Sequence, residues 1–122
     1  MNLDMKTETI FIRGLEREII FHIGKNELDN FDVIDKGTTH DLWFHAKSVS
    51  SCHIVGEIPE DIQSNTKMRN YIIKMGALLC KQHTHKLKSQ KKVEIIYTTC
   101  KNIAKTDIPG RVITENLKSI FI

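Results

Sequence analysis

One stretch of the chain gathers side chains that could do chemistry. Residues 41–47 read Asp-Leu-Trp-Phe-His-Ala-Lys and hold the only tryptophan, and another histidine follows at His53. The alternation is typical of a β-strand whose even-numbered, apolar residues face a core. The odd-numbered face carries Asp41, Trp43, His45 and Lys47. An acid, an aromatic ring, an imidazole and an amine on one face predict a recognition or scaffold role.

A hairpin symmetric about Val49, with its turn within residues 48–51, would bring His45 opposite His53 and Trp43 opposite Val55. Cross-strand partners stand about 4.5–5.5 Å apart at Cβ, so the two imidazoles could act on one bound group. The turn contains no Gly, Asn or Asp to select a turn type. The register is therefore an expectation for the structure to test.

Strand-like runs recur along the chain and are separated by turn residues. They span residues 9–12, 17–23, 41–47, 52–55, 93–100, 111–114 and 118–122. The first two runs predict a hairpin, and the last two predict a closing hairpin. Residues 27–35 suit either a helical turn or a short strand, and no helix is expected to start cleanly after residues 24–26.

One helix is expected from about Asn65 to Lys81, capped by Ser64 or Asn65. Its predicted buried stripe is Met68, Tyr71, Ile72, Met75, Leu78 and Leu79. Its predicted outer face is a basic row of Lys67, Lys74 and Lys81, for which plain solvation is the alternative. The pattern predicts an α+β fold, with an antiparallel sheet of about six strands and one principal helix packed on a face. Residues 1–122 are expected to form a single domain.

Composition narrows the class of protein. The 122 residues include 40% hydrophobic and 27% charged residues, which is ordinary for a globular domain. No apolar run approaches the roughly 20 residues of a membrane span, and no signal pattern opens the chain. A cytoplasmic protein without a membrane partner is expected. Cys52, Cys80 and Cys100 lie far apart, which favours reduced, mostly buried thiols over disulfides or a zinc finger.

Charge distribution is more informative than the net charge of +3. Residues 81–92 contain lysines and histidines but no acid. The basic residues are Lys81, His83, His85, Lys86, Lys88, Lys91 and Lys92. A basic flank on a nearly balanced protein favours a polyanionic partner, although a solvated lysine-rich loop would look the same.

Taken together, these residues resemble the NFACT-R domain, from about residue 18 to the end of the chain. The matching segments occur in the same order as in that family. They are Gly24-Lys25-Asn26, Asp41-Leu42-Trp43-Phe44-His45-Ala46, His53, Val93-Glu94-Ile95-Ile96-Tyr97-Thr98, Lys101-Asn102, Lys105, Pro109-Gly110 and Lys118-Ser119-Ile120-Phe121-Ile122. One departure is Ser50-Ser51-Cys52, where the family commonly has Pro-Gly-Ser, and it predicts a different turn before His53.

The resemblance implies a non-catalytic RNA-binding domain without a required metal or cofactor. In that family the domain usually belongs to larger proteins that act on stalled ribosomes and bind tRNA and the large subunit. Structured RNA (tRNA or rRNA) and possibly the ribosome are therefore the expected partners, in ribosome-associated quality control. Some relatives are linked to fibronectin binding or DNA sensing. A DNA-binding or protein-interaction module is the alternative, and the oligomeric state stays open.

Candidate contact residues follow from charge, ring chemistry and the resemblance. The expected nucleic-acid contacts are Lys25, Asn26, Trp43, His45, Lys47, His53, Lys67, Lys74, Lys81, Lys86 and Lys88. The turn at residues 24–26 can aim backbone N–H groups and an amine at a phosphate. Asp41 would repel phosphate, so we expect a structural or histidine-orienting role for it. An enzyme or metal site built from His40, His45, His53, Asp41 and Cys52 is less favoured because no zinc-binding spacing is present.

Overall fold

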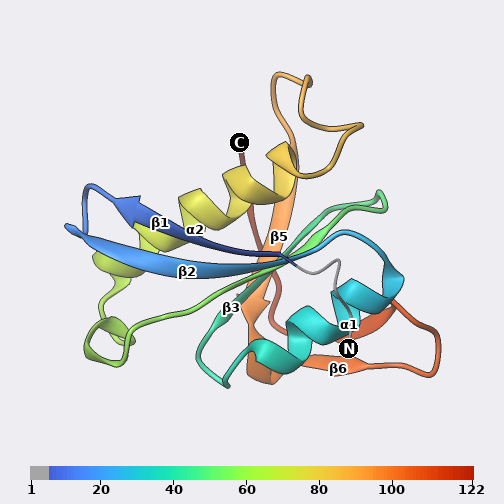
Figure 1. The fold of residues 1–122 in the computed structure, drawn as a ribbon, viewed down its shortest axis with the longest axis horizontal. Coiled ribbons are helices and arrows are strands. Elements are labelled where there is room, and N and C mark those ends of the chain that lie inside the picture. Colours follow the sequence, from blue (N-terminus) through green and yellow to red (C-terminus); the bar gives the residue numbers. More distant parts are fainter. Residues whose placement is uncertain (1–5) are drawn as a thin grey trace.

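The computed structural model describes residues 6–122, with only the backbone described at residues 27 and 28. Six strands form one antiparallel sheet in the order β1-β2-β4-β3-β5-β8 (Figure 1). They are β1 (Lys6–Ile12), β2 (Arg17–Gly24), β3 (Leu42–Ala46), β4 (His53–Gly56), β5 (Glu94–Thr99) and β8 (Lys118–Phe121). The expected α+β class and the expected six-stranded antiparallel sheet are confirmed.

Two helices and a short ribbon complete the fold. They are α1 (Glu27–Lys36), α2 (Thr66–Gln82) and the paired strands β6 (Ile103–Lys105) and β7 (Val112–Thr114), with 3-10 turns at Glu60–Ile62 and Cys100–Asn102. The α2 helix begins after Asn65, whose side chain accepts the Met68 N–H at 3.0 Å. The predicted principal helix and its cap are therefore confirmed.

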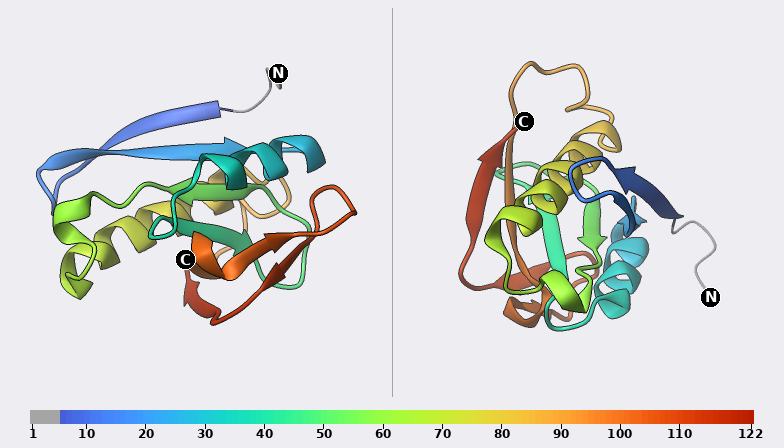
Figure 2. Two further views of the ribbon diagram at one scale, coloured as in Figure 1. Left: turned by 90° about the horizontal axis from the view of Figure 1, so that it is seen from below. Right: turned by 90° about the vertical axis from the view of Figure 1, so that its left-hand side faces the viewer.

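The sheet is covered on both faces. Leu42 and Phe44 of β3 pack into the larger core with α2, whereas Trp43 packs with Val33 of α1 and with Val55. The β6–β7 ribbon lies beside α1 (Figure 2), and Lys105 of β6 pairs with Asp35 of α1. The second face of β3 therefore packs into a second, smaller core.

The ambiguous segment at residues 27–35 is a helix, and the expectation that no helix begins after residues 24–26 was wrong. Asn26 caps α1, since its side-chain oxygen accepts the Asp29 N–H at 2.9 Å. An asparagine at this position satisfies one of the four unpaired N–H groups of a helix start. The cap was visible in the sequence, but the short apolar pattern after it was not decisive.

The predicted closing hairpin was also wrong. Strand β7 pairs with β6, and β8 pairs with β5, so the two runs join different sheets. Segments of three or four residues carry too few alternating positions to specify a partner. The last strand is packed as expected, because Ile120 and Ile122 are half-buried against the larger core.

The buried stripe of α2 differs in part from the prediction. Met68 and Tyr71 are 38% and 37% exposed, and small residues at 76 and 77 are buried instead. A Cβ added at Gly76 would lie 2.3 Å from the ring of Phe44, which is fully buried. Helix α2 therefore approaches the sheet most closely at its smallest residues.

This close approach predicts the sign of a substitution. Gly76→Ala should raise helix propensity by about 0.5–1 kcal/mol, yet we expect a net loss of roughly 1–3 kcal/mol in unfolding free energy because the ring of Phe44 must move. Urea unfolding of this variant beside Lys74→Ala, on the exposed side of α2, measures the difference. A more stable Gly76→Ala protein would contradict the packing.

Candidate nucleic-acid interface

The β3–β4 hairpin has the expected register. Trp43 lies opposite Val55 and Phe44 opposite Ile54, so the next step places His45 opposite His53. The imidazole rings of these histidines have centroids 4.9 Å apart and are nearly perpendicular. The predicted histidine pair is confirmed.

Trp43 is only 2% exposed and cannot offer its ring to a base, so the expectation that it contacts nucleic acid was wrong. Its ring stacks on His45 with centroids 5.7 Å apart, and its Nε1–H donates to Nδ1 of His53 at 3.3 Å. Helix α1 and the β6–β7 ribbon cover this face of the sheet. Trp43 is therefore a buried support for both histidines.

Burial favours the neutral form of both histidines by lowering the pKa of each ring. Burial, and then the nearby charge of His45, lowers the pKa of His53 to about 3. Burial also lowers the pKa of His45. The hydrogen bond to the Ala46 carbonyl raises this pKa and the nearby Lys86 ammonium lowers it, and the net shift is downward. A low-dielectric surrounding disfavours the charged imidazolium.

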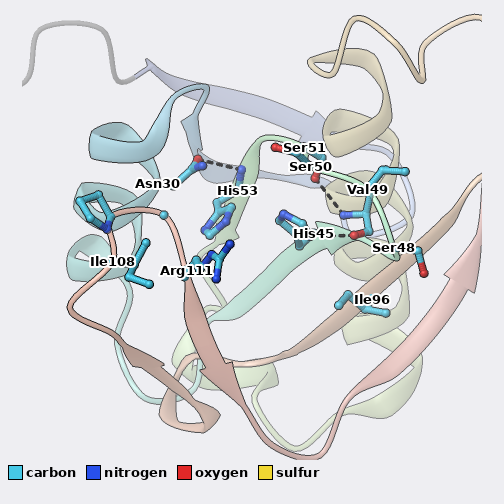
Figure 3. Close-up of a pocket in the computed structure, with 13 residues that line it drawn as sticks. Asn30, His45, Ser48, Val49, Ser50, Ser51, His53, Ile96, Ile108 and Arg111 are labelled. Atoms are coloured by element: carbon cyan, nitrogen blue, oxygen red, sulfur yellow. Dashed lines mark hydrogen bonds between the residues drawn. The ribbon is translucent and has the colours of Figure 1, made fainter.

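Two adjoining pockets open at this end of the sheet, on either side of Asn30, Ser50 and Ser51. The first, which we call the histidine pocket, has a volume of about 640 Å³ (Figure 3). It is lined by Asn30, His45, Ala46, Ser48, Val49, Ser50, Ser51, His53, Ile96, Ile108, Pro109, Gly110 and Arg111. The second, the basic pocket, has a volume of about 550 Å³. It is lined by Lys25, Asn26, Asn30, Ser50, Ser51, Cys52, His83, Thr84, His85 and Lys86.

Side-chain hydrogen bonds hold the walls of these pockets. Asn30 of α1 accepts the His53 N–H at 3.1 Å, and Ser51 accepts the Ala46 N–H at 2.9 Å. Thr84 accepts the Cys52 N–H at 3.2 Å and donates to the Cys80 carbonyl at 2.8 Å. The β3–β4 turn is thus tied both to α1 and to the end of α2.

Comparison with known proteins identifies the family. The model of the NFACT protein RNA binding domain matches residues 8–116. The chain belongs to this family. Membership supports an RNA-binding role for this NFACT RNA-binding domain.

Individual relatives agree with the assignment. The chain is 29% identical over 118 residues to the Coiled-coil domain-containing protein 25 homolog of Dictyostelium discoideum, covering 91% of this chain and 54% of that protein. It is 30% identical over 92 residues to Coiled-coil domain-containing protein 25 of Bos taurus, covering 70% and 40%. The chain spans about half the length, or less, of these curated relatives.

A solved structure shows the same fold. It is the C-terminal part of the fibronectin/fibrinogen-binding protein from Streptococcus suis, with a TM-score of 0.73 and 24% identity, covering 96% of this chain and 45% of that one. Within residues 6–122, no helix is long and apolar enough to cross a membrane.

The pockets of this NFACT domain collect some of the expected contact residues. Lys25, Asn26 and Lys86 line the basic pocket, and His45 and His53 line the histidine pocket. Arg111 was missed, because the β6–β7 loop that carries it was assigned to a closing hairpin. The neighbouring Pro109-Gly110 indicated a turn, but the sequence did not indicate that the next strand, β7, pairs with β6.

Other expected contacts lie outside both pockets. Lys47 pairs with Glu94 at 3.5 Å, and Nζ of Lys81 donates to the Ile122 carbonyl at 3.2 Å. Lys67 and Lys74 are exposed on α2, and Lys88 is exposed in the loop after it. The predicted basic row therefore does not converge on the pockets.

The turn at residues 24–26 works differently from the expected phosphate cradle. The Lys25 N–H donates to the Asp29 carboxylate at 3.3 Å, and the Asn26 side chain is used as the helix cap. These polar groups stabilise the start of α1, which leaves the Lys25 ammonium as the group able to meet a phosphate.

Asp41 has a structural role. It is 4% exposed, and its carboxylate accepts the Thr38 N–H at 2.9 Å and the Ile58 N–H at 2.8 Å. It precedes β3, whereas His45 lies near the other end of that strand, and the His45 ring bonds the Ala46 carbonyl instead. In the described part of the chain, no three His, Cys, Asp or Glu side chains group as metal ligands.

Proposed function

We propose that this domain binds structured RNA, either tRNA or rRNA, in a ribosome- or translation-associated role in the cytoplasm. The two pockets and their rim are the proposed contact surface. The observation that carries this proposal is the set of basic side chains around them, without any acid in either lining among the described residues. These side chains are Lys25, His85, Lys86 and Arg111, and His83 beside them pairs with Glu8 at 3.3 Å.

The fold, more than the net charge, creates this surface. The basic side chains come from three segments: the β2–α1 turn, the loop after α2, and the β6–β7 loop. Acids gather instead around a pocket lined by Glu18, Asp41 and Glu57. Since Asp41 precedes β3 and Glu57 follows β4, this acidic pocket lies at the opposite end of the β3–β4 pair from His53. Charge separated in this way favours one orientation of a polyanion.

Fluorescence anisotropy with labelled tRNA across a salt series tests the proposal. Each lysine–phosphate contact contributes about 0.9 to the slope of log K against log salt. The double variant Lys25→Ala, Lys86→Ala should therefore reduce this salt-dependence slope by about 2. It should also weaken tRNA binding roughly tenfold or more near 0.1 M salt. Co-sedimentation with ribosomal subunits tests the translation-associated role.

The matched control is Lys67→Ala with Lys74→Ala, which removes the same charge from α2. Lys67 and Lys74 precede His83 by sixteen and nine residues, about 24 Å and 14 Å along the helix axis. The control pair should leave the slope unchanged. If only the control pair lowers the slope, the proposed contact surface is in the wrong place. If tRNA does not bind at all at low salt, the proposed RNA role itself is contradicted. A duplex DNA of similar length tests whether the contact is selective for RNA.

A further inference from the structure

The histidine pocket contains two imidazoles whose tautomers are set by their neighbours. Nδ1 of His45 lies 2.7 Å from the Ala46 carbonyl oxygen, which can only accept, so this nitrogen carries the proton. Nε2 of a neutral His45 is then an acceptor. Nδ1 of His53 accepts from Trp43 Nε1–H at 3.3 Å, so His53 carries its proton on Nε2 as a donor.

The donor of His53 reaches the pocket. In the part of the chain that the structure describes, every fully buried side-chain nitrogen or oxygen has a hydrogen-bond partner. The ring of His53 forms its hydrogen bond through Nδ1, and its Nε2 has no partner among these residues. This nitrogen is therefore not enclosed, and His53 lines the pocket (Figure 3). With ring centroids 4.9 Å apart and ring planes nearly perpendicular, the two neighbouring imidazoles supply one acceptor and one donor to the wall of the same pocket.

This pair selects the chemistry of the ligand. A phosphate or carboxylate oxygen only accepts, so it would face the lone pair of His45 without a hydrogen bond. The Watson–Crick edge of every nucleobase carries a donor next to an acceptor, which complements the pair. Base pairing occupies that edge in a duplex, so the base must be unpaired and turned out of its stack.

The remaining walls suit a flat, weakly polar ring. Val49, Ile96 and Ile108 supply apolar surface, and Arg111 supplies a cation within the same lining. A pocket of about 640 Å³ is within the range of sites that enclose small molecules. The basic pocket next to it, with Lys25 and Lys86, provides charge for the flanking phosphates.

We propose that the histidine pocket takes one unpaired nucleobase of the bound RNA, read through Nε2 of His45 as acceptor and Nε2–H of His53 as donor. The inference rests on the proposed function and adds the ligand of its central pocket. All four bases present an adjacent donor and acceptor on one edge, so the pocket selects an unpaired nucleotide over a paired one. Phosphates are held by the neighbouring cations.

Binding to three labelled RNA hairpins tests this inference: a fully paired stem, the same stem with one bulged nucleotide, and that stem with an abasic bulge. The bulged stem should bind roughly tenfold more tightly than the other two, the difference expected for one well-made base contact. His45→Phe keeps a ring on Trp43 but removes the acceptor, so it should abolish this difference while the paired stem still binds. Lys25→Ala with Lys86→Ala should weaken all three hairpins alike, and His40→Phe, at an exposed position outside both pockets, should change nothing.

A second measurement uses the unaltered protein and does not depend on any variant folding. Proton–nitrogen correlation spectra of the imidazoles should show the Nδ1–H form of His45 and the Nε2–H form of His53, with both Nε2 resonances shifting when the bulged RNA is added. Unshifted resonances at saturating RNA, or equal affinity for the bulged and abasic stems, overturn this inference alone. Failure of every hairpin to bind overturns the proposed function.

Discussion

Asp41→Ala is expected to lower the free energy of unfolding by roughly 3–5 kcal/mol. The carboxylate of Asp41 accepts two backbone N–H groups, from Thr38 and Ile58, at 2.9 Å and 2.8 Å. Alanine would remove two hydrogen bonds to a carboxylate, each worth about 1.5–3 kcal/mol, and would leave the buried Ile58 N–H without this acceptor. Because these bonds tie the loop before β3 to the chain after β4, we expect the loss to appear in urea unfolding as a lower midpoint.

Asp61→Ala is the matched control for this prediction. Asp61 forms a two-bond ion pair with Arg17 at 2.9 Å and 3.0 Å, and both side chains are largely exposed. Exposed ion pairs contribute about 0–1 kcal/mol, so this control should stay close to the unaltered protein. Asp41→Asn should be intermediate, since an amide keeps one acceptor oxygen. Equal stability of the Asp41 and Asp61 alanine variants would contradict the structural role of Asp41.

Acidification is expected to destabilise the domain through His53. The pKa of His53 is about 3 in the folded protein because the ring is buried, against about 6.5 in an unfolded chain. Below pH 6.5 the unfolded state therefore binds a proton that the folded state does not, and unfolding becomes easier as the pH falls. Through this one group, lowering the pH from 7.5 to 5 should reduce the free energy of unfolding by about 2 kcal/mol, and the effect disappears above about pH 7.5.

His53→Gln isolates this contribution, because glutamine does not titrate and can still accept from the Trp43 indole. Its unfolding free energy should fall with acidification by about 2 kcal/mol less than that of the unaltered protein over the same pH range. Some dependence should remain, because the pKa of His45 is also lowered by burial. His40→Gln, at an exposed position, should keep the full dependence. The same pH dependence in His53→Gln and the unaltered protein would show that His53 is not buried as a neutral ring.

Local patterns in the sequence were sufficient for the central hairpin and the main helix. Alternation over residues 41–47 predicted which residues share each face of β3, and an assumed symmetry about Val49 gave the register that pairs Trp43 with Val55. Asn65 marked the start of α2 by ordinary capping chemistry. These features depend on neighbours within a few residues, so the sequence alone contains their cause. The NFACT-R likeness followed from the same residues and is confirmed by the family model.

Only the tertiary structure decided what covers each face. Trp43 is buried because α1 and the β6–β7 ribbon pack over it, and neither was expected there from local pattern. Arg111 reaches the histidine pocket because β7 pairs with β6 and not with β8. Pairing between short strands and the packing of one layer on another depend on contacts between residues distant in the chain, which periodicity does not encode. The histidine pair was therefore predictable from the hairpin, whereas the pocket around it required the fold.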